Sequence, residues 1–577
     1  MADILLKLSI PNPHQQYLHV ELLLKNIKED IDILLPTWRP GRYEEGNFAK
    51  NIKGFKVFDD QNKALHFSKT SKHSWHVDSK KAKNIRIQYQ YYAAELNAGS
   101  TLVEKEMLYI NPVNCLMYVK ERMGDKVQID FEVPKTWKIA GSLEQINETS
   151  YTVESFDELF DTPVICSPNL ICKSYETNGY HFHLWFNDLN GIKWERLITD
   201  FKKFTKKQIE DFGEFPCKEF HFLFHTPNNL AYHGVEHLKS TVIALGPKYD
   251  VFGKLYSELL GVSSHELYHV WNVKTIRPKE MMPYDFGAAN YSKMGYVYEG
   301  VTTYMGDLYL LKSGVFSLDE YLKELEKQFQ KHFDNSGRFN HAVSESSFDT
   351  WLDGYVKGAP GRKVSIYVEG CLLAFITDYM LRKSTNNKLG LEGVMKRMYY
   401  HPEIIEKGYD EDSYRNMLEN ASSISFRSLF KDHMNGTVSY EGLLLEALDY
   451  FGLELIKKPA PSYSKSILGI KTQVKSNGTF VVDIYPGSPA DMGGLRIGDQ
   501  IMGVNKTQIN KNLDQWLQYF NESKEIFLTL SRNQNIKEVL IPILNRSFYQ
   551  EYKIHTKKDA DKNQIKALQS WGCLRDL

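Results

Sequence analysis

The segment His265-Glu266-Leu267-Tyr268-His269 decides which fold and which chemistry this chain can support. Two histidines four residues apart lie on one face of a helix, so both imidazoles can bind one zinc ion. Glu266 then lies beside the water that the metal activates. With 18 His and 72 Asp and Glu together in 577 residues, chance supplies at most about 0.07 such matches per chain. The pattern therefore predicts a zinc site with a general base.

The residues around this segment predict that its helix is mostly buried. Its apolar side chains are Leu259, Leu260, Val262, Leu267, Val270 and Trp271. Buried ionisable groups need a partner or a metal. Two solvated histidines on a surface helix are therefore the weaker interpretation.

A catalytic zinc ion needs a third protein ligand. The extended motif with a third histidine requires Gly at position 272 and His at position 275, where this chain has Asn272 and Thr275. Glu280 and Asp285 lie in a Pro-containing stretch too close to the motif to return to it. Glu299 opens a helical run with 29 residues between it and the second histidine. We therefore expect Glu299 to be the third ligand.

A second cluster, Tyr232-His233-Gly234-Val235-Glu236-His237, precedes the motif. Its two histidines are also four residues apart and could form a separate metal site, but no carboxylate companion is obvious. The favoured interpretation is an edge, flanked by Gly234, that presents Glu236 beside the zinc. An acid there can pair with the free α-amino group of a peptide. A loop glutamate without a role is the alternative.

Length and composition predict a well-packed multidomain protein. At roughly 150 residues per domain, 577 residues suggest about four domains. The net charge of -1 gives no global field that would attract nucleic acid or an anionic membrane. The apolar stretches stop far short of the ~18 residues that a membrane span needs.

The six cysteines form no Cys-x-x-Cys pair, so neither a thiolate zinc cluster nor a disulfide framework is expected. The N-terminal residues show no basic region followed by an apolar segment and a cleavage site. The simplest expectation is a cytoplasmic protein, although a chain trimmed of its signal peptide would look the same.

Hydrophobic periodicity divides the chain into regions. Period-2 runs in the first ~170 residues predict a β-sandwich or a saddle-like sheet. These runs are Leu5 to Ile10, Leu18 to Leu24, Ile31 to Leu35, Ile85 to Tyr91 and Val127 to Val133. Helical period follows at Trp194 to Phe212, Lys254 to Val273, Met294 to Lys312, Leu318 to His332, Val368 to Arg382, Gly390 to Tyr400, Ser425 to Met434 and Tyr440 to Phe451. Pro459 to Pro461 marks a boundary before a small β-rich module, Leu468 to Ile543.

On its motifs the sequence resembles the glycyl aminopeptidase family of zinc metallopeptidases. The matching segments are Tyr232 to His237, His265 to Lys274, Arg277-Pro278, Pro283 to Asp285, Glu299-Gly300 and, near the N-terminus, Leu35 to Tyr43. The resemblance implies a multidomain α+β fold with a fixed order of domains. These are a β-rich N-terminal domain (1–172), a thermolysin-like zinc peptidase domain with a helical C-terminal part (173–458), a PDZ domain (462–545) and a C-terminal tail (546–577).

The resemblance also implies roles for the motif residues. His265, His269 and Glu299 are expected to hold one zinc ion per chain, and Glu266 to act as the general base on a zinc-bound water.

Two further implied roles concern the substrate. Glu236, with Gly234 beside it, is expected to bind the free amine of the peptide. Related enzymes place a tyrosine hydroxyl opposite the base to stabilise the oxyanion, and in the segment Val364 to Gly370 the candidate is Tyr367. A packing role for Tyr367 is the alternative.

The module after the boundary resembles a PDZ domain of the protease-associated kind. Leu468, Gly469 and Ile470 occupy the place of the loop that binds a peptide C-terminus through backbone N–H groups. Leu513 to Phe520 would be the helix beside the peptide groove. A module that only buttresses the catalytic domain is the alternative.

The leading hypothesis is a zinc aminopeptidase that removes the N-terminal residue of peptides. The resemblance implies a preference for Gly or Ala at that position. One alternative is an endopeptidase with the same zinc chemistry, in which Glu236 is only structural. Another is a PDZ-based interaction protein with an inactive protease domain.

Overall fold

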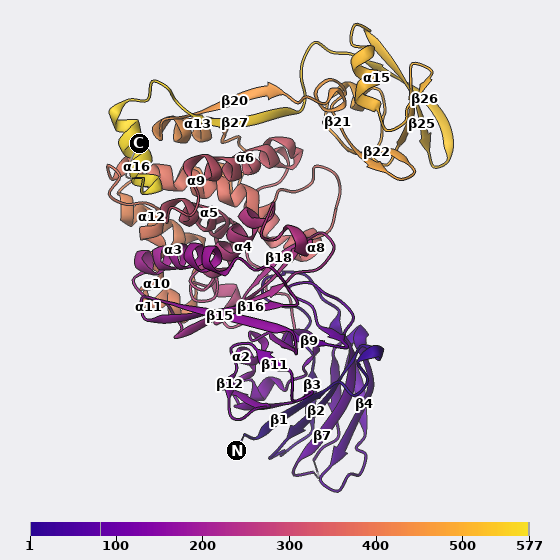
Figure 1. Ribbon diagram of the computed structural model, residues 1–577, viewed down its shortest axis with the longest axis vertical. Coiled ribbons are helices and arrows are strands. Elements are labelled where there is room, and N and C mark those ends of the chain that lie inside the picture. The colour runs from indigo at the N-terminus through magenta and orange to yellow at the C-terminus, as the bar shows by residue number, and fades with distance from the viewer. Residues whose placement is uncertain (1, 81, 575–577) are drawn as a thin grey trace.

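The computed structural model describes residues 2–80 and 82–574 and shows a multidomain α+β protein (Figure 1). A β-rich N-terminal domain lies at one end, a mixed middle domain carries most of the helices, and a small β-rich domain lies at the other end. Each part has a hydrophobic cluster of its own. No helix in the described part of the chain is long and apolar enough to cross a membrane.

The N-terminal domain is built around a seven-stranded sheet with the order β12-β13-β10-β1-β2-β7-β4. Its strands are β1 (Ile4–Ser9), β2 (Tyr17–Leu24), β4 (Ile52–Asp59), β7 (Ile85–Tyr92), β10 (Val127–Glu132), β12 (Glu144–Gln145) and β13 (Ser150–Val153). In β2 every second side chain is buried, which is the burial that a one-sided sheet gives to period-2 sequence. The predicted strands agree with the observed ones to within one or two residues.

A loop of residues 35–43 leaves the N-terminal domain after β3 (Ile31–Leu34) and enters the middle domain. We call it the 35–43 loop. The indole N–H of Trp38 donates to the carbonyl of Asp285 at 2.8 Å, and the Thr37 amide donates to the carbonyl of Phe286 at 2.8 Å. The two domains therefore share a boundary that is hydrogen-bonded through the backbone.

The middle domain begins with a five-stranded sheet in the order β15-β16-β17-β19-β18. These strands are β15 (Leu170–Thr177), β16 (Tyr180–Asn187), β17 (Glu219–His225), β18 (Ala231–Glu236) and β19 (Ser240–Gly246). β18 pairs only with β19 and is antiparallel to it, so it forms the edge of the sheet. The segment that carries Glu236 is this edge strand.

Helices pack against this sheet and form the rest of the middle domain. They include α3 (Trp194–Phe212), α4 (Tyr256–Tyr268), the π-helix η6 (Tyr296–Val301), α5 (Thr302–Lys312), α6 (Leu318–Asp334), α9 (Ile366–Ser384) and α13 (Glu441–Tyr450). α6 begins with a capping box between Ser317 and Glu320. α4 and α9 have buried residues all around, as expected of helices inside a large core.

The third domain contains β21 (Ile470–Lys475), β22 (Gly478–Ile484), β23 (Gln500–Val504), β25 (Glu525–Arg532), β26 (Asn535–Pro542) and the helix α15 (Leu513–Tyr519). A two-stranded ribbon joins it to the middle domain (Figure 1). The chain leaves on β20 (Leu453–Pro459) and returns on β27 (Gln550–Thr556).

The segment 546–577, which we expected to be a tail, is therefore built into the middle domain as far as it is described. After β27 it forms α16 (Lys562–Gly572), which packs among the helices of the middle domain. Trp571 is fully buried, stacks on Phe451 at 4.5 Å and donates its indole N–H to the hydroxyl of Tyr304 at 2.7 Å. Burial of this large aromatic side chain holds the segment in place.

Candidate metal centre and active site

The helix α4 presents the two histidines of the motif to a cleft. His265 lies in its last turn, and His269 follows directly as its C-cap. α5 approaches α4 closely at this point, because a Cβ atom on Gly306 would lie only 2.9 Å from the Cα of His265. Only glycine permits this distance, so α5 packs directly against the helix that carries the motif.

Glu299 comes from the π-helix η6, immediately before α5. π-Helical turns are rare and frequently occur at functional sites. The Nε2 atoms of His265 and His269 lie 3.0 Å apart, and the Oε2 of Glu299 lies 3.7 Å and 3.4 Å from them, respectively. All three side chains thus direct one ligand atom toward a common point, as expected from the sequence.

These separations match a zinc ion. With bonds of about 2.0–2.1 Å, tetrahedral coordination places neighbouring ligand atoms about 3.3–3.4 Å apart, and the observed edges are 3.0–3.7 Å. Two imidazole nitrogens and one carboxylate oxygen are the ligand types of a catalytic zinc site. The residues therefore fit the metal.

A hydrogen bond on the side away from the metal site fixes the orientation of the His269 ring. Its Nδ1 lies 2.7 Å from the carbonyl oxygen of Asn272, so Nδ1 carries the proton and Nε2 keeps its lone pair for a metal. The amide of Asn272 in turn donates to the carbonyl of Val297 and to the hydroxyl of Thr302, both at 3.0 Å. Asn272 thereby links the histidine to the helices that carry Glu299.

Glu266 lies in the cleft with room made for it by the edge strand. It is 4% exposed, and its Oε2 has no hydrogen-bond partner among the described residues. A Cβ atom on Gly234 would lie 2.1 Å from the Oε1 of Glu266. The glycine predicted beside the amine site therefore gives space to the carboxylate of the predicted base.

Glu236 lies on the other side of His269. Single ligand atoms of Glu236, Glu266 and His269 lie within 4.8 Å of one another. Glu236 is 3% exposed, and its Oε1 has no partner among the described residues. Gly41 of the 35–43 loop closes this end of the cleft, because a Cβ atom there would lie 2.4 Å from the Oε2 of Glu236.

The carboxylates of this cleft differ in their electrostatics. Burial raises the pKa of Glu266 well above its ordinary value and also raises the pKa of Glu236. Burial acts the same way on Glu299, but the neighbouring His269 and His265 outweigh it and lower the pKa of Glu299. For Glu266 and Glu236, which form no ion pair with a described residue, burial outweighs the nearby positive charges, whereas for Glu299 the two histidines outweigh burial.

The cleft has a volume of about 650 Å³ and contains every metal-site and substrate-site residue predicted from the sequence, Tyr367 included. Tyr367 lies in the first turn of α9. Burial, together with the nearby Glu299, raises the pKa of the Tyr367 hydroxyl. The hydroxyl is therefore protonated at neutral pH and can donate a hydrogen bond.

The two histidines of the second cluster contact different residues in the structure. His233 faces Arg39, with 3.5 Å between Nε2 and Nη2, whereas His237 Nδ1 lies 3.1 Å from Asp161. In a strand, residues four apart are separated by about 13 Å along the chain. They share no metal-binding group with a carboxylate among the described residues.

A third group, His183, Glu219 and His221, lies on β16 and β17 away from the cleft. The indole N–H of Trp185 donates to His221 Nδ1 at 3.1 Å. The proton of a neutral His221 then sits on Nε2, the atom that faces Glu219, and no lone pair is left for a metal there. With this proton position, His221 is not a ligand, which leaves His183 and Glu219 as the only possible ligands of this group.

Two features of the cleft were not predicted. The first is the contribution of the N-terminal domain, in which the 35–43 loop carries Arg39 and Gly41 to the edge strand. The second is a buried network on the opposite wall, where Glu369 lies 2.9 Å from His332 and accepts a hydrogen bond from Tyr440. The loop was visible in the sequence as a motif, but no feature of it indicated what it contacts.

In the third domain, the predicted peptide-binding loop lies where η9 (Ser464–Leu468) meets β21. Leu468 and Ile470 are buried. The Gly469 amide donates to the carbonyl of Ser464, so it is engaged within the turn. Peptide binding at Leu468, Gly469 and Ile470 stays a prediction.

Models of known families match three stretches of the chain. Residues 5–168 match the peptidase M61 N-terminal domain, residues 258–373 match M61 glycyl aminopeptidase, and residues 480–532 match a PDZ domain. No curated protein matches the sequence.

A solved structure with a high TM-score shares the fold, and a second one has a lower TM-score. An aminopeptidase N family protein from Idiomarina loihiensis is 23% identical, with a TM-score of 0.91 over 98% of this chain and 99% of that chain. An M1 zinc metallopeptidase from Deinococcus radiodurans is 11% identical, with a TM-score of 0.47 over 76% of this chain and 94% of that chain.

Two histidines on one helix, a glutamate on the next helix and an unpartnered glutamate between the histidines form a group typical of zinc metallopeptidases. The chain carries stretches that match the N-terminal and catalytic domains of the M61 glycyl aminopeptidase family and a PDZ domain, and it is a metallo-aminopeptidase. The predicted family, fold class and enzyme class are confirmed.

Proposed function

We propose that this aminopeptidase removes the N-terminal residue of peptides, with one zinc ion held by His265, His269 and Glu299. The observation that carries the exopeptidase assignment is the carboxylate of Glu236. It is buried beside the metal site, lacks a cationic partner within the described residues, and is enclosed by Gly41 at the closed end of the cleft. The ammonium of a peptide supplies the charge that this carboxylate needs.

A zinc ion in this site would supply Lewis acidity, which polarises a carbonyl group and makes water a better nucleophile at neutral pH. The remaining chemistry belongs to side chains of the chain itself. Glu266 accepts the proton of the attacking water, and its unpartnered Oε2 leaves it free to do so. The same carboxyl group then gives the proton to the leaving amine.

Glu236 and Tyr367 fix the substrate around the base. An ammonium bound to Glu236 places the first peptide carbonyl at a set distance from the anchor, so cleavage occurs after one residue. The protonated Tyr367 hydroxyl donates to the oxygen that becomes negative as the carbonyl carbon turns tetrahedral. Both residues come from rigid elements, the edge strand β18 and the helix α9.

The match to glycyl aminopeptidases supports a preference for small N-terminal residues such as Gly or Ala, and aromatic side chains pack around Glu299 beside the site. The rings of Tyr43 and Tyr298 lie 5.0 Å apart, and the Tyr43 amide donates to the Tyr355 hydroxyl at 3.3 Å. Tyr43, Tyr298, Tyr355 and Tyr367 all lie near enough to Glu299 for its charge to raise their pKa values. Of these four, Tyr367 lines the cleft.

The experiment compares matched free and N-acetylated peptides with the zinc-loaded protein. A charge-assisted contact is worth about 1.5–3 kcal/mol, so Glu236→Gln should lower kcat/KM on free peptides by about ten- to a hundredfold. Its zinc content should stay unchanged. Glu176→Gln, an exposed position on β15 of the same sheet, serves as the control. Equal wild-type rates on free and acetylated peptides would replace the aminopeptidase by an endopeptidase.

A further inference from the structure

Arg39 is a buried cation without an acidic partner. The residue is 5% exposed, yet its guanidinium makes no ion pair with any described residue. Its polar contacts are one hydrogen bond to the carbonyl of Pro40 at 3.3 Å and an approach of 3.5 Å to His233. Burial, reinforced by the charges of Arg39 and Arg42, lowers the pKa of His233 to about 3, so this neighbour is neutral. Buried arginines are almost always paired.

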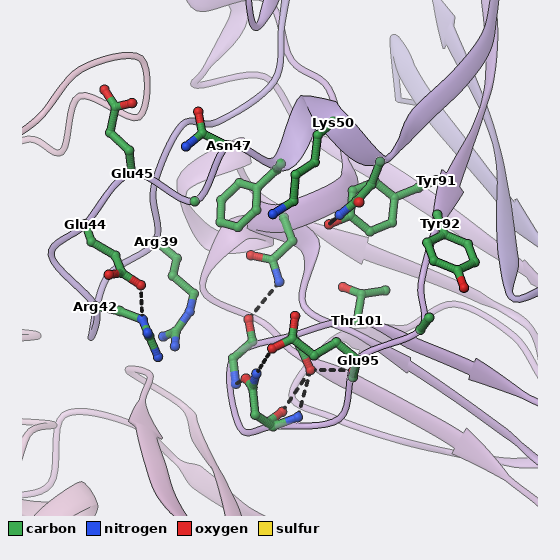
Figure 2. Close-up of a pocket in the computed structure, with 18 residues that line it drawn as sticks. Arg39, Arg42, Glu44, Glu45, Asn47, Lys50, Tyr91, Tyr92, Glu95 and Thr101 are labelled. Atoms are coloured by element: carbon green, nitrogen blue, oxygen red, sulfur yellow. Dashed lines mark hydrogen bonds and ion pairs between the residues drawn. The ribbon is translucent and has the colours of Figure 1, made fainter. Parts of the chain in front are cut away.

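The guanidinium forms one wall of a cavity in the N-terminal domain, drawn in Figure 2, with a volume of about 330 Å³. Gly99 makes room for it, because a Cβ atom there would lie 2.0 Å from the Arg39 Cζ. The two neighbouring cations differ in their pairing. Arg42 is paired with Glu44. Lys50 also lines the cavity but forms no ion pair with a carboxylate of the described chain (Figure 2).

A second buried group in the same cavity lacks a partner. Asn114 is 2% exposed and donates through Nδ2 to the carbonyl of Gly99 at 2.7 Å. Its Oδ1 has no hydrogen-bond donor among the described residues. The cavity therefore offers unmet donors at Arg39, whereas the Oδ1 of Asn114 is buried below its surface.

We propose that this cavity binds a small zwitterion, an α-amino acid or a very short peptide. Its carboxylate would pair with Arg39, because the planar guanidinium matches a carboxylate with two parallel hydrogen bonds. Its ammonium group would pair with the carboxylate of Glu95, which lines the cavity and accepts a hydrogen bond from Asn97 but forms no ion pair with a described residue. The other two acids of the lining, Glu44 and Glu45, are paired with Arg42 and Lys72. The Glu95 carboxylate favours an ammonium and disfavours phosphates and nucleotides.

This site is distinct from the catalytic cleft. The two cavities share no lining residue, and the Arg39–His233 contact separates them. The family's reaction releases an amino acid, so its product has the chemistry that the second cavity accepts. The proposal does not require that product to be the ligand, since any free amino acid carries the same two groups.

The test measures thermal unfolding of the full-length, zinc-loaded protein with glycine and L-alanine as probes, at constant ionic strength. Saturating glycine should raise the Tm of the wild type by about 2 °C or more. Acetate and methylamine, which carry one group each, should have smaller effects, and phosphate should have none beyond that of chloride. Arg39→Gln should abolish the response. Without ligand, this variant should unfold at the wild-type temperature or above, because it removes a buried unpaired charge.

Three further variants control the result. Lys50→Gln, at an exposed position, should weaken the glycine response and leave the fold intact. Lys56→Gln, an exposed lysine on β4 outside the cavity, should respond like the wild type. Glu236→Gln should also keep the response, which separates this cavity from product binding in the catalytic cleft.

An unliganded Arg39→Gln protein that unfolds at a lower temperature, together with a wild type that ignores glycine, would show that Arg39 is structural and overturn the proposal. A response lost in Glu236→Gln but kept in Arg39→Gln would place the amino acid in the cleft and overturn it as well. A response to phosphate alone would reject the zwitterion.

Discussion

The ammonium of Lys274 lies 2.7 Å from Oδ1 of Asp161. Lys274 follows the second histidine of the metal site by five residues. Asp161 caps α2 (Phe156–Phe160) in the N-terminal domain. It also contacts His237 Nδ1 at 3.1 Å and accepts from the Leu238 amide at 2.9 Å. One carboxylate thus holds the chain beyond the zinc motif and the end of the edge strand to the N-terminal domain.

We expect Asp161→Asn to destabilise the protein. Removing one partner leaves Lys274, 7% exposed, as an uncompensated buried charge, which costs about 3–5 kcal/mol. Denaturant unfolding measures the loss. Asp412→Asn, which breaks an exposed pair with Arg415, is the control and should cost less than about 1 kcal/mol. Equal losses in both variants would contradict the anchoring role.

The same pair predicts how stability depends on pH. Burial opposes ionisation of Asp161, but Lys274 and His237 outweigh it and lower its pKa, while Asp161 raises the pKa of Lys274 against burial. A depressed carboxyl pKa stabilises the fold above its unfolded value of about 3.9, and this stability is lost as the pH falls below that value. A raised lysine pKa stabilises the fold below its unfolded value of about 10.4, and this stability is lost as the pH rises above that value. The free energy of unfolding of the wild type should therefore exceed that of Asp161→Asn by the largest amount between about pH 3.9 and about pH 10.4.

Glu299→Ala should remove or greatly weaken metal binding, because two histidines alone leave a catalytic zinc under-coordinated. Metal analysis after dialysis measures this. Glu258→Ala removes another carboxylate of the same cleft and should retain the metal. Stoichiometric zinc in the Glu299 variant would place the third ligand elsewhere.

Glu266→Gln should keep the metal and lose turnover. The side chain is not one of the three converging ligands, but it is the only predicted base, and general-base catalysis typically contributes about 10²–10⁴-fold. Initial rates and zinc content on one preparation test both parts. Near-normal activity would rule out Glu266 as the base.

Gly234→Ala should impair catalysis although it replaces no catalytic side chain. The new methyl group would lie 2.1 Å from the Oε1 of Glu266, so the carboxylate must move. A displacement of about 1 Å at a reacting group can cost roughly a hundredfold in rate. Gly442→Ala, on α13 with no atom within 4 Å of its Cβ position, is the matched control. Unchanged kcat/KM in both variants would show that the carboxylate adapts.

Local sequence predicted the elements well, and the residues that it proposed as metal ligands lie together in the structure. The helix expected at Trp194 to Phe212 is observed with those bounds, and the third ligand expected at Glu299 lies with His265 and His269. Both predictions depended on periodicity and on ligand spacing along neighbouring helices, which a sequence displays directly. The roles of His265, His269 and Glu299 as zinc ligands remain predictions. The chemical roles of Glu266, Glu236 and Tyr367 also remain predictions.

What the sequence did not reveal depends on contacts between distant segments. Arg39 meets His233 across 194 positions, and Gly41 meets Glu236 across a similar span. No periodicity encodes which loop of one domain closes the cleft of another. The turn that engages the Gly469 amide likewise depends on the π-helical geometry of Ser464–Leu468, which a motif match does not resolve.

The ribbon of β20 and β27 has a consequence for synthesis. Because Trp571 completes the helical core of the middle domain, the ribosome must translate the entire PDZ domain before the peptidase core can close. The nascent chain therefore carries its zinc motif for some 300 residues of translation without the last piece of the domain that supports it. The core of the peptidase domain can therefore close only after α16, which follows the PDZ domain in the chain, has been translated.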